Sequence, residues 1–155
     1  MKPPKIPLIE NLDPNPEKAI SQKILYFQQK VGSLLYTTII IRSDAAKAAN
    51  KLSEFLTNSS KTYLEAVDKA ISYLFGTKFY AIEFNNKSKD SEVFICTSDA
   101  AFADNRSDRK STEGYLCKLF SRSIDWKTSK QKTVTTSTTE AELLAISEAG
   151  KQLFW

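Results

Sequence analysis

The spacing of the apolar residues changes at Phe79, and this change restricts the chain to folds that combine helices with a sheet. Before Phe79, apolar residues recur at intervals of three and four, as on one face of a helix. After Phe79 they form short runs between polar segments, which is typical of strands. The order predicts an α+β fold, in which a helical segment precedes an antiparallel three-stranded sheet and one last helix.

Three helices are predicted in the first half of the chain. The first carries an apolar stripe that continues into residues 39–41, and the second ends near residues 58–60. These stripes are Phe27, Val31, Leu34 and Leu35, and then Ala48, Leu52, Phe55 and Leu56. In the third helix, Thr62 and Glu65 have the spacing of a capping box and Gly76 suits the C-terminal cap.

The second half is expected to hold the sheet. Residues 79–84 could form a strand and residues 85–90 a turn, while 104–113 read as a polar loop. Strands are predicted at 93–97, 115–120 and 123–128, with Ser121-Arg122 as the connection between the last two. A final helix starts near Thr139 and carries Leu143, Ile146, Gly150 and Leu153 on one face.

Three segments follow from these patterns. All five prolines lie within the first 16 residues, so residues 1–21 are predicted to be an extended leader. Residues 22–78 form the helical segment and residues 79–155 the sheet-containing segment. No apolar run is long enough for a membrane span or a signal peptide, so we expect an intracellular protein, cytoplasmic or nuclear, without a membrane partner.

Composition limits the chemistry available to the chain. It contains no histidine, which excludes mechanisms that depend on a histidine base within this chain. Its two cysteines, Cys96 and Cys117, have no nearby partner for a zinc site and are expected to be free thiols. Carboxylates must therefore carry any catalysis. The net charge of +4 is a mild excess that by itself decides nothing about partners.

Two carboxylates occupy positions from which they could converge. Asp99 follows a predicted buried strand, and Glu142 lies in the first turn of the predicted last helix. Oxygen ligands suit a hard cation such as Mg²⁺, and a pair of such ions can promote phosphodiester cleavage. The spacing alone also fits simpler roles, because Asp99 could be a turn residue and Glu142 could pair with Thr139 in a helix cap.

Several longer sequence motifs are more specific. SDAAFADN at residues 98–105, DRKSTEGY at 108–115 and KQKTVTTSTTEAELLAISEAGK at 130–151 closely resemble the ribonuclease H domain of copia-type retrotransposons. YFQQKVGSLLY at 26–36 and AISYLFGTK at 70–78 resemble the same polyprotein just upstream, at the end of its reverse transcriptase. The resemblance covers nearly the whole chain after the leader.

The resemblance implies a site and a parent activity. Matched position by position, Asp99 and Glu142 would be catalytic metal ligands, and Glu140 would be solvated or support the helix dipole. The parent polyprotein would hydrolyse the RNA strand of RNA·DNA hybrids with Mg²⁺ or Mn²⁺. The paired-aspartate polymerase signature and the remaining ribonuclease H carboxylates are absent, so this chain is expected to bind no metal tightly and to depend on the rest of the polyprotein.

Basic residues flank the two carboxylates. They could be an ordinary solvated surface, or they could contact the phosphates of a hybrid weakly and without sequence preference. The candidates are Arg109, Lys110, Lys127, Lys130 and Lys132. A non-enzymatic alternative therefore stands beside the enzymatic one, in which the chain is an inactive relic or a domesticated module that binds nucleic acid or protein.

Overall fold

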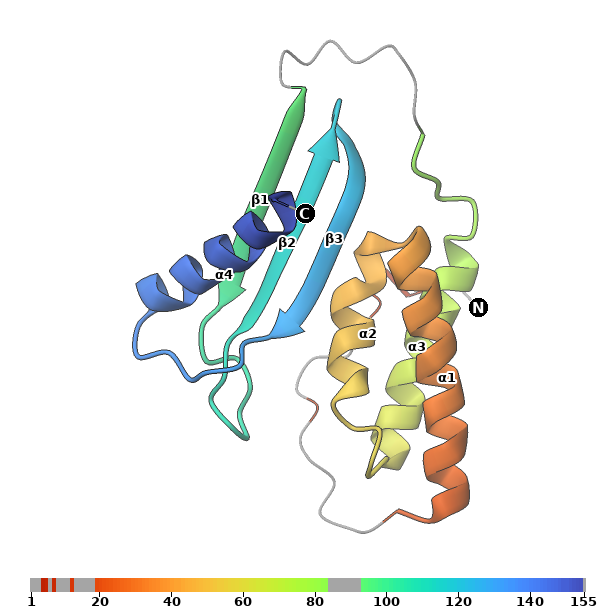
Figure 1. Cartoon of the computed structure of the whole chain (residues 1–155). Coiled ribbons are helices and arrows are strands. Elements are labelled where there is room, and N and C mark those ends of the chain that lie inside the picture. Colours follow the sequence, from red (N-terminus) through yellow and green to blue (C-terminus); the bar gives the residue numbers. More distant parts are fainter. Residues whose placement is uncertain (1–3, 6, 8–11, 13–18, 84–92, 155) are drawn as a thin grey trace. The chain divides into compact units, whose positions relative to one another are not determined.

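A computed structural model of the chain describes residues 4–5, 7, 12, 19–83 and 93–154. It has four α-helices and a three-stranded antiparallel sheet within these residues, which confirms a mixed α+β fold (Figure 1). The chain divides into two compact units, Met1–Ala81 and Ile82–Trp155. The predicted leader lies mostly outside the described residues, although Leu12 is buried against the first unit's core.

The first unit is helical, and its core is made of large side chains. Helices α1 (Ser21–Ile40), α2 (Ala46–Ser53) and α3 (Lys61–Gly76) pack on one another, with the short 3₁₀ turn η1 (Ser43–Ala45) between the first two. The three predicted helices are therefore confirmed. The core residues are Phe27, Val31, Leu34, Ala49, Leu52, Tyr63, Ala66, Val67 and Ala70, together with Leu12.

The start of α3 differs from the prediction. Ser60, not Thr62, is the N-cap residue, and its hydroxyl accepts a hydrogen bond from the Tyr63 amide at 3.3 Å. The predicted pairing of Thr62 with Glu65 is therefore wrong, because Thr62 already lies inside the helix. Serine is a strong N-cap residue since its short side chain reaches the unpaired amides of the first turn.

A polar network ties the end of α1 to the end of α3. The buried Arg42 donates two hydrogen bonds to Asp44, at 2.9 and 2.7 Å, and one to the Thr77 hydroxyl at 2.6 Å. The Tyr73 hydroxyl donates to the same carboxylate at 2.7 Å. The Arg42 guanidinium and then the Tyr73 hydroxyl hold the pKa of Asp44 below its usual value, against the opposing effect of burial. Every member is partnered, so the network acts as a structural clamp.

The second unit contains the sheet and one helix. Strands β1 (Phe94–Ala101), β2 (Thr112–Leu119) and β3 (Arg122–Lys130) form an antiparallel meander in the order β1-β2-β3, and α4 (Thr138–Leu153) follows. The possible strand at 79–84 is wrong over its described part, because residues 77–79 form a turn and 80–83 have no regular structure. Residue 84 and the predicted turn at 85–90 lie outside the described residues.

The strands are longer than predicted. β1 continues through Asp99 to Ala101, and β2 begins at Thr112, inside the predicted loop. The connection between β2 and β3 is Phe120-Ser121 instead of Ser121-Arg122. Both of its residues have positive φ, 47° and 63°. Such values match the two-residue turns that fit the twist of a hairpin, although glycine or asparagine is usual there.

Helix α4 packs on β1 and β2 (Figure 1). The contact is made by small side chains. Its buried residues are Ala141, Ala145 and Ala149, spaced at intervals of four. The apolar stripe predicted from the sequence is on a different side of the helix and is largely exposed, as described below. Within the described residues, no helix has the length and apolar character needed to cross a membrane.

Candidate functional site

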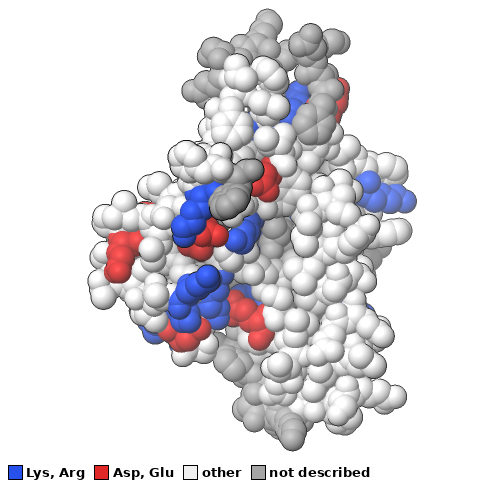
Figure 2. Space-filling view, viewed as in Figure 1, with Lys and Arg blue, Asp and Glu red and all other residues white. Residues whose placement is uncertain are grey.

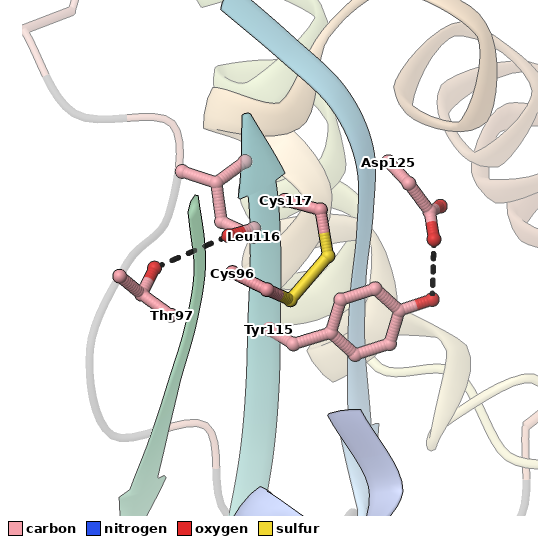
Figure 3. The surroundings of a disulfide bond; sticks show 6 residues. All are labelled: Cys96, Thr97, Tyr115, Leu116, Cys117 and Asp125. Atoms are coloured by element: carbon pink, nitrogen blue, oxygen red, sulfur yellow. Dashed lines mark hydrogen bonds between the residues drawn. A yellow bond between two sulfur atoms is a disulfide. The ribbon is translucent and has the colours of Figure 1, made fainter. Parts of the chain in front are cut away.

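The two faces of the sheet have different surroundings. Successive side chains of a strand point to opposite faces. Tyr115 and Cys117 of β2 are buried with Ala149 of α4, and Cys96 packs against them. Figure 3 shows Cys96, Cys117 and Tyr115 on one side of the strands and Thr97 on the other. The face of Cys96 and Cys117 is therefore the one that α4 covers.

Asp99 lies on the other face. It is exposed, it pairs with Gly114 of β2, and the register between β1 and β2 runs without a shift from Phe94 to Ala101. Because Asp99 is three residues beyond Cys96, alternation directs its side chain away from α4. It lies near the end of β1, as expected, but within the strand, because β1 extends beyond the predicted 93–97. A turn role for Asp99 is excluded for the same reason.

Glu142 has no capping role. The N-cap residue of α4 is Ser137, whose hydroxyl accepts from the Glu140 amide at 3.2 Å. The Glu140 carboxylate accepts from the Thr136 amide at 2.7 Å and from the Thr136 hydroxyl at 3.0 Å. These bonds lower the pKa of Glu140. Glu140 is exposed and lies in the first turn of α4, as expected, and it also completes the cap. Glu142 is a half-buried residue of the helix interior.

The two candidate ligands extend from different surfaces of the sheet unit. Their elements are in contact, since α4 packs on β1. The Asp99 side chain nevertheless extends from the face of the sheet that α4 leaves uncovered, whereas the Glu142 side chain extends from α4 itself. Within the part of the chain that the structure describes, no three His, Cys, Asp or Glu side chains are grouped as a metal site would need. A divalent cation needs more oxygen ligands than two separated carboxylates provide.

The cysteines also differ from the prediction. Cys96 and Cys117 are directly opposite each other in the β1–β2 register and form a disulfide across the two strands (Figure 3). The expectation of free thiols is therefore wrong. It failed because the two residues are 21 positions apart, and only the strand pairing brings them together.

Two of the five candidate basic residues are held in ion pairs on different faces of the sheet. Lys127 pairs with Glu148 of α4 at 2.9 Å, and Lys130 pairs with Asp108 of the β1–β2 loop at 3.2 Å. By alternation along β3, Lys127 projects on the side of α4 and Lys130 on the opposite side. On the face shown in Figure 2, basic atoms lie beside acidic atoms and do not form a continuous patch.

The other three candidates belong to the loops at one end of the sheet. Arg109 and Lys132 are exposed and Lys110 is half-buried. Arg109 has a positive φ of 58°, and its amide donates to the Asn105 carbonyl at 2.8 Å. The buried Asn105 side chain accepts from the Ser107 amide at 3.0 Å and the Ser107 hydroxyl at 2.7 Å. This loop therefore presents Arg109 and Lys110 on a backbone shaped by internal hydrogen bonds.

A second polar cluster, which the sequence analysis missed, joins this loop to the start of α4. Ser111 is fully buried, and its hydroxyl is 3.1 Å from that of Thr135. The buried Gln131 donates from its side chain to the Ala141 carbonyl at 2.9 Å. Short polar residues after a strand predict a turn, but no spacing rule indicates that they will be buried together.

A third unpredicted contact lies on the covered face. The Tyr115 hydroxyl donates to Asp125 at 3.1 Å (Figure 3). Burial, followed by the Asp125 charge, raises the pKa of Tyr115 to about 12. The tyrosine is thus protonated at neutral pH and serves as a donor beneath α4.

Comparison with known proteins places the chain among retrotransposon Pol sequences. It is 37% identical over 139 residues to the Pol polyprotein of transposon TNT 1-94 from Nicotiana tabacum, and 34% identical over 125 residues to that of transposon RE1 from Arabidopsis thaliana. These matches cover 90% and 81% of this chain, but only 10% and 8% of the polyproteins.

A shorter relative matches over most of its own length. The chain is 35% identical over 125 residues to the secreted RxLR effector protein 161 of Plasmopara viticola, which covers 81% of this chain and 87% of that protein. No known family profile matches the chain. No solved structure matches it either. The chain belongs to the family of Pol-related sequences that unites this short protein with the retrotransposon polyproteins.

Proposed function

We propose that this chain corresponds to the junction of reverse transcriptase and ribonuclease H in a copia-type Pol polyprotein, and that by itself it is not a nuclease. In the intact parent, Asp99 and Glu142 would be two of the carboxylates that hold Mg²⁺ or Mn²⁺ for hydrolysis of the RNA strand of a hybrid. The observation that carries the proposal is the match of 90% of this chain to one segment of a Pol polyprotein.

The positions of the two carboxylates support the proposal that this chain by itself is not a nuclease. Asp99 is exposed on the face that α4 leaves open, while Glu142 is half-buried on α4. Convergence in the parent would need a local change in β1, such as one extra residue bulged between Cys96 and Asp99, which would reverse the direction of the Asp99 side chain. Glu142 is available for such a role because Glu140 makes the capping bonds.

A hybrid-cleavage assay tests whether this chain by itself is a nuclease. The purified chain, incubated with a labelled RNA·DNA hybrid and Mg²⁺ or Mn²⁺, should release no more product than a protein-free sample. Cleavage that disappears in both Asp99→Asn and Glu142→Gln would show that this chain forms the site by itself and would contradict the proposal.

A chimera tests the parent role. This chain would replace the matching segment of the tobacco Pol polyprotein, and the same hybrid would be the substrate. We expect cleavage that falls by roughly a hundredfold or more in Asp99→Asn and in Glu142→Gln, since removal of a charged catalytic group typically has that effect. Glu140→Gln, two residues away on the same helix, is the matched control and should remain active. An inactive chimera, or equal losses in all three variants, would refute the assignment.

A binding function is the second candidate, and the exposed basic residues at one end of the sheet favour it. The match covers 87% of the secreted RxLR effector protein 161 of Plasmopara viticola. A segment of this kind is therefore found in a short protein outside a polyprotein. For this chain we propose weak, sequence-independent binding of nucleic acid through the β1–β2 loop and the end of β3. Arg109, Lys110 and Lys132 would contribute most, because Lys127 and Lys130 are engaged by carboxylates.

Salt titration tests the binding candidate. Affinity for a random-sequence hybrid should fall steeply with salt, because each phosphate contact releases counterions. Replacing Arg109, Lys110 and Lys132 with alanine should flatten this dependence. Lys23, Lys47 and Lys61 are exposed lysines of the helical unit, and their triple alanine variant is the control with the same loss of charge. Equal effects of the two triple variants would show that binding follows net charge alone, and the loop would then not be the site.

A further inference from the structure

The Cys96–Cys117 disulfide is the strongest constraint on the register between β1 and β2 (Figure 3). None of the eight residues of β1, all of which the structure describes, is buried, whereas β2 buries Tyr115 and Cys117. A buried apolar face normally fixes the register of a strand, because a slip by one residue would turn that face to solvent. Because β1 lacks such a face, its register depends on the disulfide.

The two faces of β1 are nearly interchangeable. By alternation, the side of α4 holds Phe94, Cys96, Ser98 and Ala100, and the open side holds Ile95, Thr97, Asp99 and Ala101. A slip that sets Ile95 opposite Cys117 would bring Ile95 under α4, beside Tyr115 and Ala149, in place of Cys96. The backbone hydrogen bonds would form again one residue along the strand. Little apolar burial is therefore lost in the exchange.

The same slip would turn Asp99 toward α4. Asp99 would then lie opposite Glu113, on the covered face of the sheet. The first turn of α4 is at this end of the sheet, because the Gln131 side chain, just after β3, donates to the Ala141 carbonyl at 2.9 Å. The slipped register therefore brings Asp99 to the side from which Glu142 extends.

We propose that the Cys96–Cys117 disulfide is a redox-sensitive lock on the register of β1, and that its reduction lets β1 slip by one residue and carry Asp99 to the side of α4. The slip itself does not depend on the proposed function. Its consequence does rest on that function, because oxidation would hold Asp99 away from Glu142 and so regulate the carboxylates assigned to the parent.

A dithiol is the class of reductant that opens the lock. Its thiolate attacks the sulfur of Cys96, which is half-buried, whereas Cys117 is only 2% exposed. The S–S bond breaks, and Cys117 leaves as a thiolate. The second thiol of the reductant then releases Cys96 from the mixed disulfide. The two cysteines gain two electrons and two protons in total, and the reductant becomes a disulfide.

The slip also has a cost. Asp99 and Glu113 would be directly opposite each other, and like charges in such a pair repel. The hydrogen bond from the Ala103 amide to the Ser111 hydroxyl, at 3.0 Å, would break as the loop shifts. The slipped register should therefore be a minor form of the reduced chain, and Glu113→Gln should increase its population.

Cysteine trapping tests the slip. In Ile95→Cys/Cys96→Ala, position 95 lies opposite Cys117 only in the slipped register. We expect its 95–117 disulfide to form roughly tenfold faster than the 94–117 disulfide of Phe94→Cys/Cys96→Ala, because position 94 is opposite Cys117 in neither register. Equal rates in the two variants would show that β1 detaches instead of slipping and would overturn the proposal.

A charge variant sharpens the trapping test. Added to Ile95→Cys/Cys96→Ala, Glu113→Gln should speed formation of the 95–117 disulfide, because it removes the repulsion from Asp99. Glu65→Gln, an exposed position of α3, is the matched control and should leave the rate unchanged. Equal rates with the two substitutions would contradict the predicted opposition of Asp99 and Glu113.

Nuclear magnetic resonance relaxation dispersion tests the lock in the unmodified chain. Reduction by dithiothreitol should produce exchange at the β1 amides, and reoxidation should remove it, while the β3 amides serve as the internal control. A reduced chain without exchange in β1, or an oxidised chain with the same exchange, would overturn the proposal. Neither test involves metal or hybrid. The lock can therefore fail while the chimera with the tobacco polyprotein is active, and an inactive chimera would leave the lock standing.

Discussion

The helical unit and the sheet unit bury their apolar residues very differently. The helical unit encloses Phe27, Leu34, Leu52 and Tyr63, each at most 1% exposed. In the sheet unit the buried apolar residues are Tyr115, Cys117 and the alanines of α4, while Leu143 and Ile146 face outward. The first unit has the core of an independent domain. The second has few large buried side chains and is held by a disulfide and buried polar contacts.

The largest effect should come from the helical core. Phe27→Ala removes a fully buried ring and leaves a cavity, which should lower the free energy of unfolding of this unit by about 3–5 kcal/mol. Amide hydrogen exchange in α1 and α3 would measure the loss. The control is Tyr36→Ala on the same helix, where the ring is 70% exposed. If the two substitutions destabilised the unit equally, its core would not be the source of its stability.

The disulfide should have the next largest effect, confined to the sheet unit. It closes a loop between residues 21 positions apart, so its removal should cost about 3 kcal/mol through the entropy of the unfolded chain. Exchange of the β1 and β2 amides with and without reductant would report this difference. The double variant Cys96→Ala/Cys117→Ala should not respond to reductant. A wild-type sheet indifferent to reductant would contradict the contrast between the two units.

Alkaline pH should weaken the sheet unit through Tyr115. The pKa of Tyr115 is raised to about 12 in the folded chain, above the ordinary tyrosine value near 10. The stability due to its protonated form is therefore fully present below about pH 10 and is lost as pH rises toward 12, by about 2 kcal/mol. Denaturant unfolding from about pH 8 to about pH 11 should show a shallower decline in Tyr115→Phe than in the wild type. Equal slopes would mean that burial and the Asp125 contact do not raise the pKa of Tyr115.

The smallest effect concerns the β2–β3 turn. Ser121 has a φ of 63°, which glycine adopts without steric strain. Ser121→Gly should stabilise the sheet unit by about 0.5–1 kcal/mol, after allowance for the greater freedom of glycine in the unfolded chain. Ser123→Gly, within β3, is the contrasting control and should destabilise it. If the melting temperatures of both variants shifted in the same direction, strain in the turn would not explain the effect of Ser121→Gly.

The same contrast explains how far the sequence could predict the fold. Large apolar residues at helical spacing identified α1 and α2, where Phe27, Val31, Leu34 and Leu52 lie on the buried face. They also identified α3, although its buried face is formed mainly by tyrosines and alanines. In α4 the same spacing of large apolar residues indicated Leu143 and Ile146 as the buried face. These two residues are exposed, because alanines make the contact with the sheet. Periodicity detects large side chains, and it cannot show which of two faces packs when the true contact is made by small ones.

The candidate site was harder to predict for a related reason. Sequence order placed Asp99 near the end of a strand and Glu142 near the start of a helix, and both belong to elements in contact. Which face Asp99 occupies depends on the register of β1 against β2 and on the side to which α4 returns. Neither is encoded in local spacing. The same long-range pairing brings Cys96 and Cys117 together and sets Lys127 beside Glu148.

Binding of Mn²⁺ followed by nuclear magnetic resonance tests most directly the claim that Asp99 and Glu142 extend from different surfaces. A bound paramagnetic ion broadens the amide signals of nearby residues. With Asp99 and Glu142 directed from different surfaces, we expect no shared, saturable broadening around the two positions, and the same weak response in Asp99→Asn. Broadening around both residues with one dissociation constant, abolished by Asp99→Asn, would place the two carboxylates in a common site and contradict the account.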